Sequence, residues 1–138
     1  MFSKIYLDTA PIIYFLENNV EYAQKIQSVI QDNAAFGCAF ATSVATNIEY
    51  LPKPLSEGKQ DLVYAFASLK KILNIESIEL TEQISMIAVN LRTKYKGLKA
   101  LDSIHIASAI ASGCDAFFTN DKQLKQISEL HILYLSDL

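Results

Sequence analysis

The sequence is poor in cysteine, with only Cys38 and Cys114 among its 138 residues. Neither residue belongs to a Cys-x-x-Cys motif, so we expect neither a zinc ribbon nor a disulfide-based scaffold. Gly37 and Ala39 flank Cys38, and Gly113 precedes Cys114, which favours reduced thiols in a core. The chemistry of this chain is therefore not expected to depend on sulfur.

Long hydrophobic runs are also missing. No stretch of about 18 apolar residues occurs, so no segment is expected to span a membrane. The apolar stretch near the N-terminus does not resemble a signal peptide, because Asp8, Pro11 and Glu17 interrupt it. Together with the reduced cysteines, this pattern favours a cytoplasmic protein.

The chain has no excess of positive charge, since 12 basic residues stand against 15 acidic ones for a net charge of −3. A protein that coats nucleic acid generally would be basic, although net charge does not exclude a local acidic site. A hydrophobic fraction of 51% and a charged fraction of 20% exclude a disordered tail. The length suits one domain, residues 1–138, because the linker-like patch at 52–54 is too short to divide it.

Strand-like and helix-like segments alternate along the whole chain. Buried or alternating β-prone runs predict strands at 4–7, 36–41, 75–80, 116–119 and 132–135. Apolar residues at helical spacing predict helices at 12–16, 21–31, 44–51, 59–73, 81–94, 101–112 and 122–127. This alternation indicates an α/β fold with a parallel sheet between layers of helices. In such sheets, ligands bind beyond the carboxyl ends of the strands.

Four carboxylates stand at boundaries of these elements. Asp8 ends the first strand, and Asp121 follows two residues after the strand that ends at Thr119. Asp102 begins an otherwise uncharged helix, and Glu49 is the only charged residue in the helix at 44–51. A parallel sheet places Asp8 and Asp121 at the same edge, whereas the positions of the other two acids depend on the topology.

Each acid alone has a simpler interpretation. Asp8 and Asp102 could cap helices, Asp121 could belong to a turn, and Glu49 could be a solvated helix residue. The joint pattern favours a metal site, because clustered carboxylates raise each other's pKa and a divalent cation removes that cost. Mg²⁺ and Mn²⁺ take oxygen ligands, and such an ion can activate water and stabilise charge on a phosphoryl group.

Four segments carry a resemblance to a known family. They are Ile5–Thr9 (IYLDT), Ser43–Glu49 (SVATNIE), Leu101–Ala109 (LDSIHIASA) and Phe118–Asp121 (FTND). In their order and in the chain length, the sequence resembles the PIN-domain family, especially the single-domain ribonuclease toxins called VapC. The resemblance implies a three-layer α/β/α sandwich with a five-stranded parallel sheet. It also implies an endoribonuclease that depends on Mg²⁺ or Mn²⁺.

The resemblance further implies roles for individual residues. Asp8 and Asp102 would be the main metal ligands, while Glu49 and Asp121 would bind metal directly or through water and help to orient the attacking water. The hydrogen-bond partners behind these acids would be Thr9, Thr119 and Asn120. The implied partners are an RNA substrate, a protein antitoxin and a second copy of the chain. Five apolar residues could serve either such an interface or the core: Tyr14, Phe15, Val63, Tyr64 and Phe66.

A basic stretch precedes Asp102 and contains a third of all basic residues: Arg92, Lys94, Lys96 and Lys99. One interpretation is a rim that contacts RNA phosphates. The alternative is a solvated helix end that the helix dipole favours. The sequence leaves both open.

His105, one turn after Asp102, is expected to be a hydrogen-bonded core residue rather than a catalytic base. Among other enzyme classes, a haloacid-dehalogenase-like phosphatase would need a second acid where this chain has Ala10. A phosphoacceptor receiver domain would need an acidic pair at the first strand and a late lysine, and neither is evident. The remaining rival is a PIN-like module that has lost catalysis and binds RNA or protein.

Overall fold

The computed structural model describes all 138 residues and contains one five-stranded parallel sheet in the order β3-β2-β1-β4-β5. The strands are β1 Lys4–Leu7, β2 Ala39–Ser43, β3 Glu76–Ile78, β4 Ala116–Thr119 and β5 His131–Tyr134. The α-helices are α1 Thr9–Leu16, α2 Ala23–Ala35, α3 Ala45–Tyr50, α4 Pro52–Ser56, α5 Gln60–Ile72, α6 Glu82–Lys94 and α7 Ala100–Ala111. Two 3₁₀ turns, η1 Lys122–Gln126 and η2 Leu135–Asp137, complete the chain. The predicted α/β fold with a parallel sheet is confirmed.

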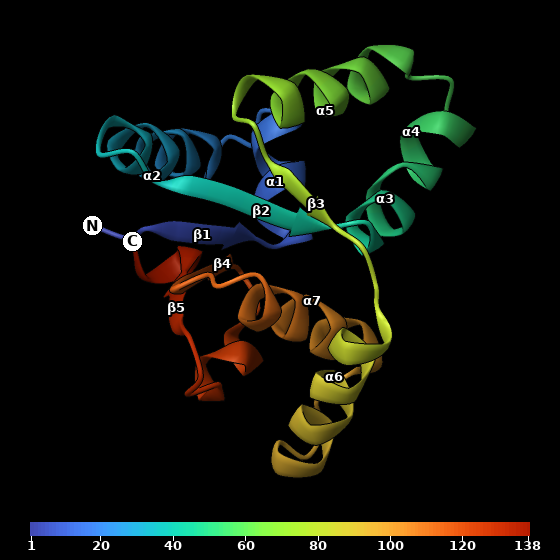
Figure 1. Cartoon of the computed structure of the whole chain (residues 1–138). Helices are drawn as coiled ribbons and strands as arrows, with labels where there is room; N and C mark the ends of the chain where they lie inside the picture. The colour runs from blue at the N-terminus through green and yellow to red at the C-terminus, as the bar shows by residue number, and fades with distance from the viewer.

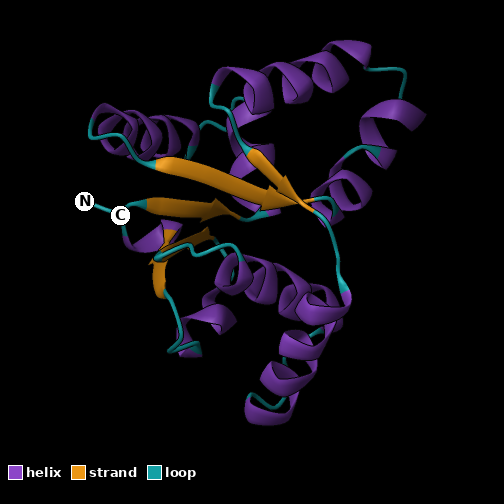
Figure 2. Cartoon of the chain, in the orientation of Figure 1, coloured by secondary structure: helices purple, strands orange, loops and turns teal.

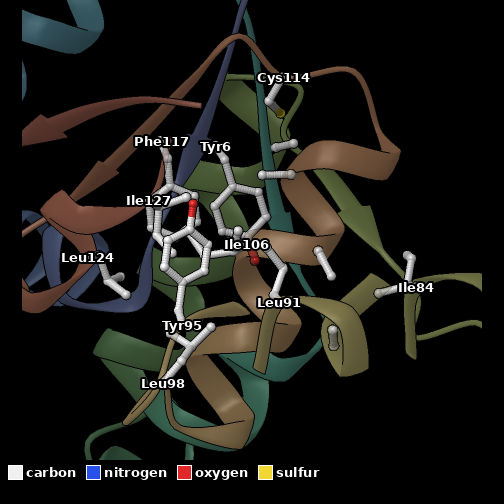
Figure 3. Close-up of a cluster of buried hydrophobic side chains, with 14 residues drawn as sticks. Tyr6, Ile84, Leu91, Tyr95, Leu98, Ile106, Cys114, Phe117, Leu124 and Ile127 are labelled. Atoms are coloured by element: carbon white, nitrogen blue, oxygen red, sulfur yellow. The ribbon is translucent and has the colours of Figure 1, made fainter. Parts of the chain in front are cut away.

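Helices cover both faces of the sheet, as Figures 1 and 2 show, with α2 and α5 on one side and α6 and α7 on the other. Successive side chains of β1 point to opposite faces of the sheet, so the strand contributes residues to the cores on both faces. Ile5 and Leu7 enter the core beneath α1, α2 and α5, whereas Tyr6 enters the core beneath α6 and α7. In the second core, Tyr6 stacks on Phe117 with ring centroids 5.0 Å apart (Figure 3).

The strand order reverses at β1, which lies between β2 and β4. The chain first builds outward to β3 and then crosses to β4 and β5 on the other side. Leu7 pairs with Phe118, and the Asp8 backbone N–H donates to the Phe118 carbonyl at 3.0 Å. The residues that follow β1 and β4 therefore emerge side by side, at the switch point where α/β sheets form their binding crevice.

The structure differs from the sequence-based prediction at three element ends. Helix α1 begins at Thr9 rather than at residue 12, because Asp8 caps it by accepting the Thr9 backbone N–H on Oδ1 at 2.9 Å. The segment expected to be a short linker is helical, since Pro52 occupies the first turn of α4, where a proline loses no hydrogen bond. Strand β2 begins at Ala39 because Phe36 and Gly37 close α2, with Gly37 at φ 82°.

None of the helices combines the length and the apolar character needed to cross a bilayer. Cys38 and Cys114 are both buried and unpaired.

Candidate functional site

Asp8 lies at the switch point and is almost completely buried, with 8% of its surface exposed. Its Oδ1 accepts the backbone N–H of Thr9 at 2.9 Å, and its Oδ2 accepts the hydroxyl of Thr119 at 2.7 Å. Burial raises the pKa of Asp8, although His105 and the Thr119 hydrogen bond partly oppose that rise. The cap of α1 and the candidate ligand are thus the same carboxylate.

Glu49 extends from α3 toward the start of α1, and its side chain is 29% exposed. Its Oε1 accepts the Thr9 hydroxyl at 2.7 Å and lies 2.5 Å from His105 Nε2. Burial disfavours the charged form of Glu49, but the hydrogen bonds from His105 and Thr9 outweigh it and lower the pKa. Glu49 therefore stays ionised beside its neighbours.

His105, which contacts Glu49, lies in the core with only 1% of its surface exposed. Its Nδ1 lies 2.5 Å from the Tyr6 hydroxyl, which comes from β1. Burial lowers the pKa of His105, but the Glu49 hydrogen bond and the charge of Asp8 outweigh it, so the pKa is raised. Burial also raises the pKa of Tyr6 well above its ordinary value, and its hydroxyl keeps the proton.

Asp102 and Asp121 come from α7 and from the segment that follows β4. Asp102 stands in the first turn of α7, and Asp121 caps η1 by accepting the Gln123 backbone N–H at 3.0 Å. Burial raises the pKa of Asp102, and the charges of Asp8 and Asp121 raise it further, with a smaller effect from Glu49. The charges of Asp8, Asp121 and Glu49 therefore all act on the Asp102 carboxylate. We refer to these four acids as the carboxylate cluster.

No lysine or arginine forms an ion pair with any of these four acids, and the one ionisable base in contact with them is His105, which lies against Glu49. Their oxygens are the hard ligands that Mg²⁺ and Mn²⁺ prefer. The side chains do not form a ready cage, because no group of three or more His, Cys, Asp or Glu residues is arranged to hold an ion. The donor set fits the usual mode for Mg²⁺, in which one or two carboxylates act together with waters.

Threonine hydroxyl groups donate hydrogen bonds to two of these carboxylates. Thr9 and Thr119 bond to Glu49 and Asp8 respectively, and the Asp121 backbone N–H donates to Thr119 Oγ1 at 3.0 Å. Behind them, the buried Thr46 and Thr42 hydroxyls lie 2.8 Å apart, and Thr42 donates to the Leu7 carbonyl. Thr119 therefore links the two acids that follow β1 and β4.

Asn120, the third predicted partner, faces elsewhere: its Oδ1 accepts the Ser136 hydroxyl at 2.8 Å. It thus contacts the C-terminal turn and not a carboxylate.

The four basic residues before Asp102 divide into two groups. Arg92 Nε donates to the Leu98 carbonyl at 3.0 Å, and Lys94 forms an ion pair with Glu129 at 3.0 Å. Lys96 and Lys99 are exposed and form no ion pair. Lys96 also lines a polar surface hollow of about 430 Å³ together with Gly97, Lys122, Gln123 and Gln126.

Sequence reasoning assigned no site role to Tyr6, Thr42, Thr46 or Lys122. One signal for His105 was available, since it follows Asp102 by three residues on a helix and therefore lies on the same side. Nothing in the sequence pairs Tyr6 with His105 or Thr46 with Thr9, because those contacts join segments that only the folded topology brings together.

Comparisons with known proteins identify the family and the fold of the chain. The sequence matches the model of the PIN domain family over residues 5–130. It has no significant match among curated proteins. Its fold is similar to VapBC2 from Rickettsia felis, solved bound to a fragment of promoter DNA, with a TM-score of 0.74 and 18% identity over 95% of this chain and 98% of that chain.

Two further solved structures are similar. VapBC-1 from nontypeable Haemophilus influenzae has a TM-score of 0.72 and 17% identity over 96% of this chain and 98% of that chain. VapBC-5 from Mycobacterium tuberculosis, a member of the VapBC family of toxin-antitoxin systems, has a TM-score of 0.63 and 16% identity over 96% and 98%. At these identities the likeness shows a shared fold.

Proposed function

The chain belongs to the PIN domain family, and on that premise we propose that it is a metal-dependent endoribonuclease that hydrolyses RNA phosphodiester bonds. We propose further that it is the toxin of a type II toxin-antitoxin pair. The observation that carries the proposal is the cluster of Asp8, Glu49, Asp102 and Asp121 at the strand-order reversal, where no lysine or arginine neutralises them.

In this proposal the ion is Mg²⁺ or Mn²⁺, and when bound it supplies a positive charge that activates water and stabilises the phosphoryl oxygens. Asp8 and Asp102 would hold it. The Thr9 N–H and the Thr119 hydroxyl fix the Asp8 carboxylate before any ligand arrives. Glu49 has both donors on Oε1, which leaves Oε2 to bind the ion or to accept a hydrogen bond from the attacking water. Asp121 would likewise bind the ion or accept a hydrogen bond from the attacking water.

The four carboxylates would repel the negatively charged phosphates of RNA. Binding of the RNA backbone therefore requires cationic side chains nearby. Lys96 and Lys122 line the hollow next to Asp121, and neither forms an ion pair. Lys99 stands at the start of α7, one turn before Asp102. We therefore place RNA phosphates along Lys96, Lys99 and Lys122, with Arg92 and Lys94 contributing less because protein groups already engage them.

A protein antitoxin and a second copy of the chain are the proposed partners, and the cytoplasm is the proposed location. Of the five residues that could serve an interface or the core, Phe66 is a core residue with 2% exposure. Tyr64 is 70% exposed, and Ile48 and Ile72 are exposed to a similar extent. These apolar side chains on α3 and α5 support a partner on that side of the molecule.

The function is tested by incubating the chain with a mixed RNA pool. Cleavage is expected with Mg²⁺ or Mn²⁺, is expected to stop when EDTA removes the ion, and should return when the ion is restored. Because the ion relieves carboxylate repulsion, Mn²⁺ should also raise the melting temperature. If no RNA is cut and Mn²⁺ causes no thermal shift, the nuclease proposal is wrong. If RNA binds without being cut, the chain is a PIN-like binding module instead.

Replacing Lys96 and Lys122 together by alanine should weaken RNA binding and lower its dependence on salt. For single-stranded RNA, each lost phosphate contact reduces the slope of log K against log salt by about 0.7. The measurement is RNA affinity by fluorescence anisotropy across a salt series, with Mn²⁺ binding expected to be unchanged. Lys71→Ala on α5, beyond the opposite face of the sheet, is the matched control. An equal slope for the double variant and the wild type would remove these lysines from the RNA path.

A further inference from the structure

Glu49 receives hydrogen bonds on one oxygen only. Thr9 from α1 and His105 from α7 both approach Oε1, at 2.7 and 2.5 Å. Glu49 itself belongs to α3, a helix of six residues, and its side chain is 29% exposed. A half-open glutamate on so short a helix would sample several rotamers without these two donors. The contacts therefore fix one oxygen and leave the other free of protein partners.

The hydrogen bonds behind Glu49 have a consistent direction. A carboxylate oxygen can only accept, so the hydrogen lies on His105 Nε2. The Tyr6 hydroxyl lies 2.5 Å from Nδ1, and it donates to Nδ1 in the neutral ring or accepts from it in the imidazolium. In both protonation states His105 therefore donates to Glu49 through Nε2 and is held by Tyr6 at Nδ1.

Tyr6, at the core end of this series of hydrogen bonds, is tightly packed. Tyr6 is fully buried, stacks on Phe117 with an interplanar angle of 4°, and lies in the core cluster that also contains Ile106 and Leu91 (Figure 3). His105 is likewise buried on α7. The orientation of the exposed carboxylate is thus coupled to the packed core beneath α6 and α7.

We propose that His105, held by Tyr6, is a positioning residue that presents Glu49 Oε2 to the divalent cation. This inference rests on the proposed function, and it gives His105 no role as a base, because Glu49 already occupies its Nε2. An imidazole that orients a carboxylate ligand is an outer hydrogen-bond partner, and loss of such partners reduces metal affinity or activity by about 10- to 100-fold.

The test compares two replacements of the same histidine. His105→Leu removes the donor, whereas His105→Gln keeps an N–H near the place of Nε2. We expect the Mn²⁺ dissociation constant, measured by titration calorimetry on the full chain, to rise about 10- to 100-fold in His105→Leu and to recover by about tenfold in His105→Gln. The RNA KM at saturating Mn²⁺ should stay constant while kcat falls. His131→Leu, at the exposed histidine of β5, is the control.

A second pair of variants keeps the inference testable if His105→Leu does not fold. Tyr6→Phe removes one hydroxyl and retains the stacked ring. It should weaken Mn²⁺ binding in the wild type but have no further effect in a Glu49→Gln background, because both changes act on the same contact. Additive effects of the two changes, or wild-type Mn²⁺ affinity in folded His105→Leu, would overturn the inference.

Failure of the inference and failure of the proposed function give different results. A wild type that binds Mn²⁺ and cuts RNA, with variants that match it, overturns the positioning role alone. A wild type that neither binds Mn²⁺ nor cuts RNA overturns the proposed function itself.

Discussion

Asp102→Asn is expected to reduce RNA cleavage more than about 100-fold, beyond the loss typical of an outer hydrogen-bond partner, because it removes a carboxylate that would touch the ion. Asp102 suits this experiment since only burial and neighbouring charges act on it, and no hydrogen bond is lost. Asparagine therefore leaves no partner unsatisfied. Cleavage and Mn²⁺ binding are measured side by side, and normal cleavage by Asp102→Asn would contradict the proposed site.

The same change should stabilise the metal-free protein. Burial and the charges of Asp8 and Asp121 raise the pKa of Asp102 in the folded chain. The folded state then binds the proton more tightly than the unfolded state, so stability is lost as pH rises from the ordinary carboxyl pKa through the raised value. Thermal unfolding in EDTA from about pH 4 to about pH 7 should show this loss in the wild type and a smaller one in Asp102→Asn.

Asp32→Asn on α2 is the matched control for both measurements, because Asp32 is exposed and lies in the helical layer away from the cluster. It should change neither cleavage nor the pH dependence of unfolding. Variants that lose activity and gain stability together would identify the cluster as a functional site held at some cost to the fold.

Phe117→Ala is expected to lower the free energy of unfolding by about 3–5 kcal/mol. Phe117 is fully buried in β4 and stacks on Tyr6 at 5.0 Å, so truncation leaves a cavity between the central strands and helices α6 and α7. Urea unfolding followed by circular dichroism gives the value.

Phe36→Ala makes the same chemical change at a side chain that is 75% exposed. It should alter the free energy of unfolding by less than about 0.5 kcal/mol. Equal effects of the two substitutions would contradict the placement of Phe117 in the core.

Much of the fold was predictable because its signals are local. Strands 4–7 and 116–119 match β1 and β4, since short apolar runs bounded by polar residues are unambiguous. The helix predicted at 81–94 matches α6, which Thr81 caps through its hydroxyl. The prediction was less accurate at Pro52, because proline both ends one helix and begins the next.

Of the candidate site, the sequence predicted the acids and, through the family resemblance, Thr9 and Thr119, which donate hydrogen bonds to Glu49 and Asp8. Asp8 and Asp121 follow strands, so parallel topology alone brings them to one edge. The contact of His105 with Glu49, and that of Tyr6 with His105, depend on how α3 and α7 pack across the end of β1. Neither helix carries a sequence pattern that specifies this packing, so the polar network required the three-dimensional structure.

The hydrogen bonds of the carboxylate cluster join residues that are far apart along the chain. Thr119 and Asp8 are separated by 111 positions, His105 and Glu49 by 56, and Thr9 and Glu49 by 40. Such contacts close late, because long loops must be ordered before they form. During synthesis, Asp8 can accept the hydrogen bond from Thr119 only after β4 has been made and has paired with β1. A growing or half-folded chain therefore lacks the assembled cluster, and the proposed ribonuclease activity begins only when nearly the whole protein has folded.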